Sequence, residues 1–280
     1  MKRMLLGVAA ALLAYANDLE RARELYSRTE YRQSLKLLDQ SSQRAEPAAL
    51  ALAGRCWYQL GDFKRAVDAL EKAVAAAPRD SNYHLWLGRA HGRRAETSNP
   101  LSAPGHAVKA RNAFEKAVEL DPANLEAMTD LFSYYLEAPG FLGGGLEKAE
   151  ALAVKIRARD EAEYHADLDR LAERRKQPDI AERQLRAAVE LAPRSAGRLI
   201  DLARHLARQG RHRESDQTFA KARKAEPSSK LVLYAQAETF IEGRRNLAEA
   251  RALLEQYLQG PLTPDDPPRE EALKLLEKAR

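Results

Sequence analysis

The chain has 280 residues, of which 45% are hydrophobic and 31% are charged, and its formal net charge is +5. This length and apolar content support a buried core, and the amount of charge excludes an integral membrane protein. Aromatic residues make up only 6%, while Ala, Leu, Glu, Arg and Lys dominate, which is typical of a helical protein. Glycine and proline fall in clusters and therefore mark the ends of helices.

Residues 1–16 have the pattern of a secretory signal peptide. Lys2 and Arg3 precede an apolar run that extends to Ala14, and Ala14 and Ala16 supply the small residues at positions −3 and −1 of a cleavage site. A membrane anchor is the alternative, but eleven apolar residues at a rise of about 1.5 Å each cannot cross a hydrocarbon core of about 30 Å. We therefore expect cleavage and a periplasmic or secreted location. Cleavage removes two positive charges and leaves a net charge of +3.

Cys56 is the only cysteine, so the chain forms no intramolecular disulfide. It stands between Arg55 and Trp57 in a segment with helical periodicity. A small buried residue is a commoner role for such a cysteine than a reactive thiol. We expect the stability of the chain to come from helix packing.

A unit of thirty-four residues, Pro47 to Asp80, carries the clearest internal pattern. A large residue stands at its position 4, a small pair at 7 and 8, an aromatic residue at 11 and a Gly-Asp-aromatic turn after that. The residues are Leu50, Ala53, Gly54, Trp57, Gly61, Asp62, Phe63, Ala66, Leu70, Ala73 and Pro78. Small residues let two antiparallel helices approach closely, large ones fill the space beside them, and Pro78 ends the second helix.

This unit closely resembles the tetratricopeptide repeat (TPR) family, and Leu87 to Gly145 also resembles exported bacterial TPR proteins of unassigned function. The same spacing marks a first repeat from about Tyr15 and five more downstream, so the resemblance covers nearly the whole chain after residue 16. It implies an all-α, right-handed superhelical solenoid of about seven helix-turn-helix repeats in residues 17–266. Residues 267–280 form an amphipathic helix that we expect to cap the array.

Two repeats are longer than the family pattern. The third gains ten residues within 92–106, and the fourth gains seven in 138–145. We expect both insertions to be loops on one edge of the array. The second insertion is rich in glycine and holds Phe141 and Leu142. It is either a contact loop with free backbone N–H groups or a longer turn whose apolar pair packs back onto the helices.

The first helix of each repeat lines the concave surface of a TPR array, and basic and aromatic residues recur at its positions 9, 12 and 13. They pair carboxylates and stack on side chains, which predicts a groove for an acidic or C-terminal-carboxylate peptide. A solvated basic face neutralised by nearby Asp and Glu is the alternative. Together with the second insertion, the candidate partner-binding residues are Arg23, Tyr26, Arg55, Tyr58, Arg89, Arg93, Tyr134, Gly140, Phe141, Leu142, Arg170, Arg174, Arg204 and Arg208.

The sequence shows no motif for catalysis, metal binding, cofactor binding or nucleic-acid binding. Gly143 to Gly145 lack the Lys-Ser/Thr of a phosphate loop, the six histidines have no metal-ligand spacing, and the positive charge is spread along the chain. We expect His84, His91 and His165 to pack inside the repeats. The function predicted is a non-catalytic scaffold or adaptor of the cell envelope that binds a protein or peptide.

Two other classes remain open: an accessory for envelope assembly or quality control, and a regulatory subunit of an envelope enzyme.

Signal cleavage is directly testable. When the complete chain is expressed in a Gram-negative bacterium, the periplasmic fraction should contain a product that begins at Asn17, as checked by intact mass and N-terminal sequencing. A product in the membrane fraction that keeps residues 1–16 would identify an anchor instead.

Overall fold

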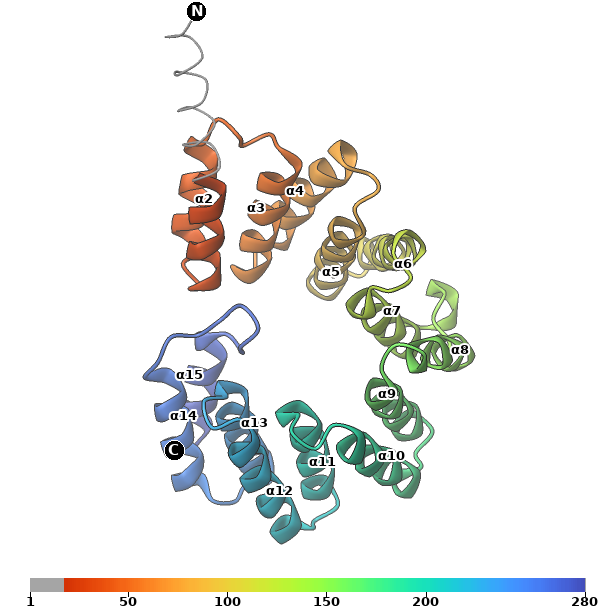
Figure 1. The fold of residues 1–280 in the computed structure, drawn as a ribbon, viewed down its shortest axis with the longest axis vertical. Helices are drawn as coiled ribbons and strands as arrows, with labels where there is room; N and C mark the ends of the chain where they lie inside the picture. The colour runs from red at the N-terminus through yellow and green to blue at the C-terminus, as the bar shows by residue number, and fades with distance from the viewer. Residues whose placement is uncertain (1–17, 280) are drawn as a thin grey trace, which may run out of the picture. The chain divides into compact units, whose positions relative to one another are not determined.

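A computed structural model of the chain describes residues 18–279. The described residues form helices and turns and contain no strand, as the sequence predicts. The chain divides into two compact units, unit 1 ending at Lys148 and unit 2 beginning at Ala149, and each is described by itself (Figure 1). The predicted signal peptide lies outside the described residues. Within them, no helix has the length and apolar character needed to cross a membrane.

Unit 1 is a series of helices connected in chain order. Residues 18–27 are helical, and α2 (Tyr31–Gln40), α3 (Pro47–Gln59), α4 (Phe63–Ala76), α5 (Ser81–Thr97), α6 (Ala103–Leu120), α7 (Leu125–Glu137) and the 3-10 turn η1 (Gly140–Leu142) follow. Within a repeat, the first helix packs on the second, as α3 does on α4 and α5 on α6. A second helix also contacts the first helix of the next repeat, as α4 does α5 and α6 does α7.

Unit 2 continues the same arrangement. Its helices are α8 (Leu146–Arg157), which begins just before the unit boundary, α9 (Glu161–Arg174), α10 (Pro178–Leu191), α11 (Ala196–Arg208), α12 (His212–Ala225), α13 (Lys230–Glu242), α14 (Leu247–Leu258) and α15 (Arg269–Lys278). The pairs are α9 with α10, α11 with α12 and α13 with α14. The predicted terminal helix forms as α15, which buries Ala272 against α13 and α14.

Small residues on the first helix of a repeat receive a large side chain from the second. A β-carbon added at Gly54 would stand 2.5 Å from Cγ of Leu70, and one added at Gly88 would stand 2.6 Å from the ring of Phe114. Leu70 is fully buried and Phe114 is 6% exposed. Because neither contact leaves room for a larger side chain on the first helix, the two contacts fix the distance between the paired helices.

The turn between the two helices uses the left-handed backbone region at the fifteenth position of the repeat. This residue has φ of 62° at Thr29, 75° at Gly61, 57° at Lys176, 73° at Gly210 and 49° at Arg244. The same conformation at the same position shows that these five repeats share one phase. Glycine occupies it in two of them, where it has no steric cost.

The first insertion is not the loop that the sequence analysis predicts. Most of its residues extend the helices: α5 continues to Thr97 and α6 begins at Ala103, so that only residues 98–102 connect them. Arg93 to Glu96 are good helix formers, and Pro104 stands in the first turn of α6, where proline is tolerated. Leu101, in the short connection, is 95% exposed.

Cys56 is fully buried, and its Sγ lies 3.5 Å from Oγ of Ser34. Burial raises the pKa of the thiol to about 11. The interpretation of Cys56 as a structural residue is confirmed.

A pair of histidines joins the lengthened helices α5 and α6. Nδ1 of His91 lies 3.1 Å from Nδ1 of His106, so one neutral ring donates a hydrogen bond to the other. His91 is 2% exposed, which confirms the expectation of a packed histidine. Its burial, together with the charges of Lys109, His106 and Arg94, lowers its pKa to about 4.

The close approach at Gly88 predicts a large effect of a small substitution. Gly88→Ala should lower the free energy of unfolding by about 1–3 kcal/mol because the added methyl group overlaps the buried Phe114 ring. Gly92→Ala is the matched control, since Gly92 lies on the same helix with nothing within 4 Å of the added β-carbon. It should raise the stability by up to about 1 kcal/mol. Urea denaturation measures both, and equal effects of the two changes would contradict the packing argument.

Burial of His91 predicts a loss of stability in acid. The pKa of His91 in the folded chain is below its ordinary value of 6.5, so its contribution is present above pH 6.5 and is lost as the pH falls toward about 4. In His91→Gln this loss should be smaller by about 1–3 kcal/mol between pH 7 and pH 4. Chemical denaturation at several pH values tests it, and parallel curves for parent and variant would refute it.

Candidate binding surfaces

In unit 1, residues from three successive first helices meet around Arg55. Its guanidinium lies 4.7 Å from the ring centroid of Tyr26, on the helix at 18–27, and 4.5 Å from that of Trp86, on α5. Tyr58 contacts Trp86 edge-on, with ring centroids 5.5 Å apart, and Arg89 lies over the same indole at 4.8 Å. We call these five residues the arginine–aromatic surface. It brings together four residues that the sequence analysis selects.

Trp86 is not among the candidate residues predicted from the sequence. A usable signal exists, because Trp86 precedes Arg89 by three residues and so shares its helical face.

Most candidate arginines of unit 1 already pair with carboxylates. Nε of Arg89 donates to Asp130 at 2.5 Å, and its Nη2 donates to Glu126 at 3.2 Å. Arg23 pairs with Glu20 at 2.6 Å, and Arg93 pairs with Glu96. These ion pairs neutralise most of the candidate arginines of unit 1, as expected for a solvated basic face, which was the alternative to a peptide-binding groove.

Arg55 differs, because no carboxylate in residues 18–279 pairs with it. Its Nε is buried without a hydrogen-bond partner among the described residues, and the same holds for the hydroxyl of Tyr26, which is 6% exposed. Burying such a group without a hydrogen bond costs about 1–3 kcal/mol. Both groups are donors, so an anionic or carbonyl oxygen that reached either of them would accept a hydrogen bond that the donor now lacks.

The second insertion forms a turn that is hydrogen-bonded to the neighbouring helices and leaves one side chain exposed. The carbonyl oxygen of Leu142 accepts hydrogen bonds from the Tyr134 hydroxyl at 2.9 Å and from Nη1 of Arg111 at 3.1 Å. Gly143 has φ of 91°, and a β-carbon at Gly144 would stand 1.8 Å from the carbonyl oxygen of Ala138. Gly143 and Gly144 therefore allow a backbone conformation that residues with a β-carbon would adopt only with strain.

Phe141 does not pack back onto the helices, since it is 83% exposed, whereas Leu142 is half-buried and Gly140 is exposed. The two alternatives for this insertion thus each hold in part. Helix side chains hydrogen-bond to the backbone of the insertion, and the Phe141 side chain is exposed to solvent.

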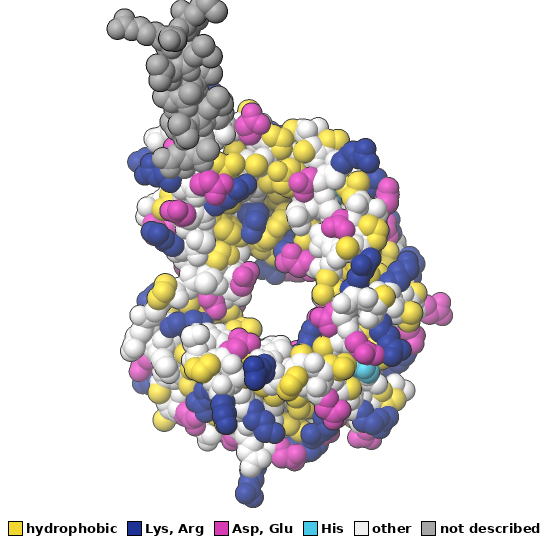
Figure 2. All heavy atoms as spheres, in the orientation of Figure 1, with side chains coloured by type: hydrophobic (Ala, Val, Ile, Leu, Met, Phe, Trp, Pro, Cys, Tyr) yellow, Lys and Arg dark blue, Asp and Glu magenta, His cyan; other side chains and the backbone are white. Residues whose placement is uncertain are grey.

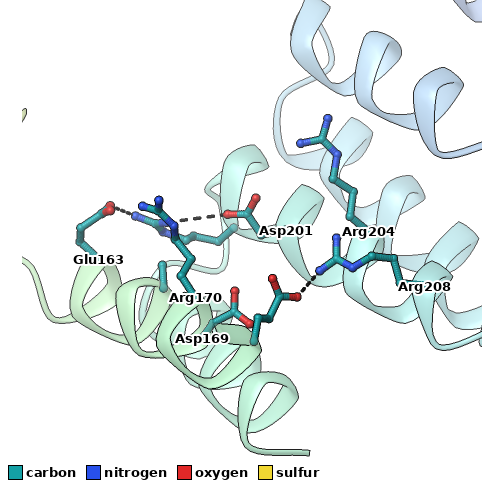
Figure 3. A pocket seen from close by; sticks show the side chains of 9 residues that line it. Glu163, Asp169, Arg170, Asp201, Arg204 and Arg208 are labelled. Atoms are coloured by element: carbon teal, nitrogen blue, oxygen red, sulfur yellow. Dashed lines mark hydrogen bonds and ion pairs between the residues drawn. The ribbon is translucent and has the colours of Figure 1, made fainter. Parts of the chain in front are cut away.

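In unit 2, two successive first helices enclose a polar pocket of about 350 Å³ (Figure 3). Side chains of both charges line it: Glu163, Ala166, Asp169, Arg170 and Glu173 from α9, and Arg198, Asp201, Arg204 and Arg208 from α11. Three candidate residues, Arg170, Arg204 and Arg208, therefore share one pocket. Arg174, one turn further along α9, is exposed and does not line it.

Ion pairs bridge the two walls of this pocket. Arg198 of α11 pairs with Glu163 of α9, and Arg208 of α11 pairs with Glu173 of α9. Arg198 also lies 3.8 Å from Asp201 on its own helix. Dashed lines mark these contacts in Figure 3, where Glu163, Asp201 and Arg208 are labelled. Arg204 pairs with Glu238 of α13 at 2.5 Å. The pocket therefore carries balanced charge, unlike the basic groove that the sequence analysis predicts. Figure 2 shows the same mixture of basic and acidic side chains over the visible face of the molecule.

Burial shifts the pKa values of one carboxyl group in the pocket and of one histidine beside it. Burial and the charges of Glu173 and Asp201 raise the pKa of Asp169 to about 7. His205, on α11, is 2% exposed, and its burial and the charge of Arg208 lower its pKa. Asp169, Glu173 and His205 have side-chain ligand atoms within 4.8 Å of one another.

No local sequence pattern indicates this cluster, because Glu173 and His205 belong to different repeats, with the whole of α10 between them in the chain.

Comparisons with known proteins agree with this architecture. The tetratricopeptide repeat family matches residues 47–80, the same unit that the sequence analysis defines, and residues 200–267. A comparison with curated protein sequences gave no match.

Solved structures of TPR proteins are similar in fold. A thermophilic TPR protein from Thermus thermophilus is 22% identical with a TM-score of 0.56, covering 69% of this chain and 98% of its own. A tetratricopeptide repeat protein from Parabacteroides merdae is 14% identical with a TM-score of 0.59, covering 95% and 99%. The C-terminal part of a TPR repeat-containing protein from Cytophaga hutchinsonii is 16% identical with a TM-score of 0.50, covering 92% and 99%.

At these identities the structures show the fold alone, and the family matches show tetratricopeptide repeats at residues 47–80 and 200–267. With its paired helices, its shared turn conformation and its small-residue contacts, the chain is a tetratricopeptide-repeat protein.

Proposed function

We propose that this protein is a non-catalytic scaffold of the cell envelope that binds an acidic segment of a partner protein on the arginine–aromatic surface. The observation that carries the proposal is Arg55, held between the rings of Tyr26 and Trp86 with no carboxylate partner in residues 18–279. TPR arrays in general present such surfaces to other proteins, and their repeats do not by themselves supply a catalytic group.

The two aromatic rings favour binding at Arg55 by fixing its side chain. A free arginine loses rotamer freedom when it binds a carboxylate, whereas a guanidinium stacked between two rings has already lost it. Each cation–π contact contributes about 0.5–2 kcal/mol, depending on its exposure. The planar guanidinium then presents its remaining N–H groups to a carboxylate in a defined orientation.

The other arginines of unit 1 play a different part in this proposal. Arg89 is held by Asp130 and Glu126, so binding a new carboxylate there would require breaking existing ion pairs. Because two carboxylates offset its charge, Arg89 adds no net positive charge beside Arg55, and it contributes by stacking on the Trp86 ring at 4.8 Å.

The envelope location rests on residues 1–16, whose basic start, apolar run and small residues are those of a signal peptide. An exported scaffold of this kind would act on other exported or membrane-anchored chains.

Substitution of Arg55 tests the binding site. We expect Arg55→Gln to weaken binding of fluorescent Asp- and Glu-rich peptides at least about tenfold, because a charge-assisted hydrogen bond contributes about 1.5–3 kcal/mol. Fluorescence anisotropy measures the affinity, and Asn- and Gln-rich peptides of the same length should bind weakly to the parent. Raising the salt concentration should weaken the specific binding.

Arg21→Gln is the matched control, since Arg21 is an exposed arginine of the neighbouring helix and its removal changes the net charge equally. Thermal melting shows whether each variant is folded. If Arg55→Gln and Arg21→Gln bind the acidic peptides alike, the proposed site is wrong. Arg55→Lys should recover only part of the affinity, because lysine keeps the charge and loses the planar donor arrangement.

We also propose that the exposed Phe141 is a second contact for the partner, and a capture experiment tests both contacts. Parent, Arg55→Gln and Phe141→Ser chains serve as baits in envelope extract, with captured proteins identified by mass spectrometry. Partners lost from both variants engage the surface and the turn together. Partners kept by both variants would place the binding site elsewhere.

A further inference from the structure

The cluster of Asp169, Glu173 and His205 in unit 2 has three features of a metal site. It contains two carboxylates and an imidazole, which are ordinary ligands of divalent transition metals. Two of the three side chains are buried: Asp169 is 7% exposed and His205 is 2% exposed. Glu173 is exposed, and it lines the pocket together with Asp169, so an ion in solvent can reach the cluster.

The helices place these side chains on facing surfaces. Asp169 and Glu173 are four residues apart on α9, so their side chains lie on one face, one turn apart. His205 projects from the neighbouring first helix, α11, and its Nδ1 lies 3.7 Å from Oε1 of Glu173. That distance is too long for a hydrogen bond. It is close to the separation of about 3.4 Å between two ligands of a tetrahedral zinc ion with bonds of about 2.1 Å.

The polar atoms of the cluster lack the partners that buried groups ordinarily have. Neither ring nitrogen of His205 has a hydrogen-bond partner among the described residues, and neither does Oδ1 of Asp169. Burying a polar atom without a partner is unfavourable, and most such atoms in proteins are paired. Ser34, another buried polar residue, donates to the carbonyl oxygen of Ala22 at 2.8 Å. Unpartnered atoms that gather at one point therefore require an explanation.

We infer that Asp169, Glu173 and His205 form a site for a divalent transition-metal ion of the zinc type. The two carboxylates balance the charge of the ion, and the imidazole supplies the nitrogen ligand. Asp169 and Glu173 border the pocket, so water or a carboxylate would reach the ion as a fourth ligand from that side. The ion would link α9 to α11, whose other cross-links in the pocket are ion pairs between arginine and carboxylate groups.

Arg208 opposes the ion, since its guanidinium pairs with the same oxygen of Glu173 that lies nearest to His205. A metal ion must displace this guanidinium or share the carboxylate with it, and the positive charge of Arg208 lowers the affinity in either case. Removal of the Arg208 charge should therefore strengthen binding of the metal ion.

The purified chain, treated with EDTA and then dialysed, is titrated with Zn²⁺ by calorimetry and with Co²⁺ by visible absorption. We expect one high-affinity ion per chain, a Co²⁺ spectrum with ligand-field bands, and a rise in melting temperature on addition of Zn²⁺. His205→Leu and Asp169→Asn should each weaken binding at least about tenfold. The ring nitrogens of His205 make no hydrogen bond in the described structure, so His205→Leu should fold as well as the parent.

His212→Leu and Glu190→Gln are the controls, because both residues are exposed and lie away from the pocket lining. They should bind Zn²⁺ as the parent does. Arg208→Gln should bind it several-fold more tightly, which a loss of folding could not produce. The inference is overturned if the parent shows no binding, if His205→Leu binds as tightly as the parent, or if Arg208→Gln leaves the affinity unchanged.

Discussion

The contact between a small residue on one helix and a large residue on its partner determines the geometry of the second and third repeats. Gly54 receives Leu70 and Gly88 receives Phe114, at distances that leave no room for a β-carbon. Alanines on the second helices are fully buried and complete the same close approach: Ala66, Ala73, Ala110 and Ala117. Because the pair is held this tightly, the first helix of every repeat presents the same face, and residues at equivalent positions become neighbours in space.

Those neighbours differ in character between the two units. In unit 1 Arg55 and Arg89 stack on aromatic rings, and Arg55 has no carboxylate partner among the described residues. In unit 2 the equivalent arginines lie among carboxylates, and the pocket between α9 and α11 has balanced charge beside a buried histidine. One repeated scaffold thus carries both the peptide-binding surface proposed for unit 1 and the metal site proposed for unit 2, because the scaffold fixes the backbone and leaves the groove positions free to vary.

The fold could be predicted from the sequence because its determinants are periodic and local. Gly54, Leu70 and Pro78 stand at fixed positions of a repeating pattern, and spacing is sufficient to place paired helices. The first insertion was predicted wrongly as a loop, since counting the extra residues within 92–106 does not reveal that helix formers at both ends extend α5 and α6.

The candidate site was predicted less completely, because its contacts cross between repeats. The candidate arginines were placed on the correct helices, but their partners, such as Asp130 for Arg89, belong to other repeats. The approach of His205 to Glu173 depends on the register of α11 against α9, which no local pattern encodes.

The left-handed turn at the fifteenth position of the repeat also affects where each unit begins to unfold locally. At Thr29, Lys176 and Arg244 the turn holds a residue with a β-carbon in a conformation that costs about 1–2 kcal/mol, whereas Gly61 and Gly210 adopt it freely. The turn closes the pair of helices, so its strain lowers the free energy of separating them locally. Local unfolding would then begin at particular repeats, and the repeats with glycine turns would stay folded longest.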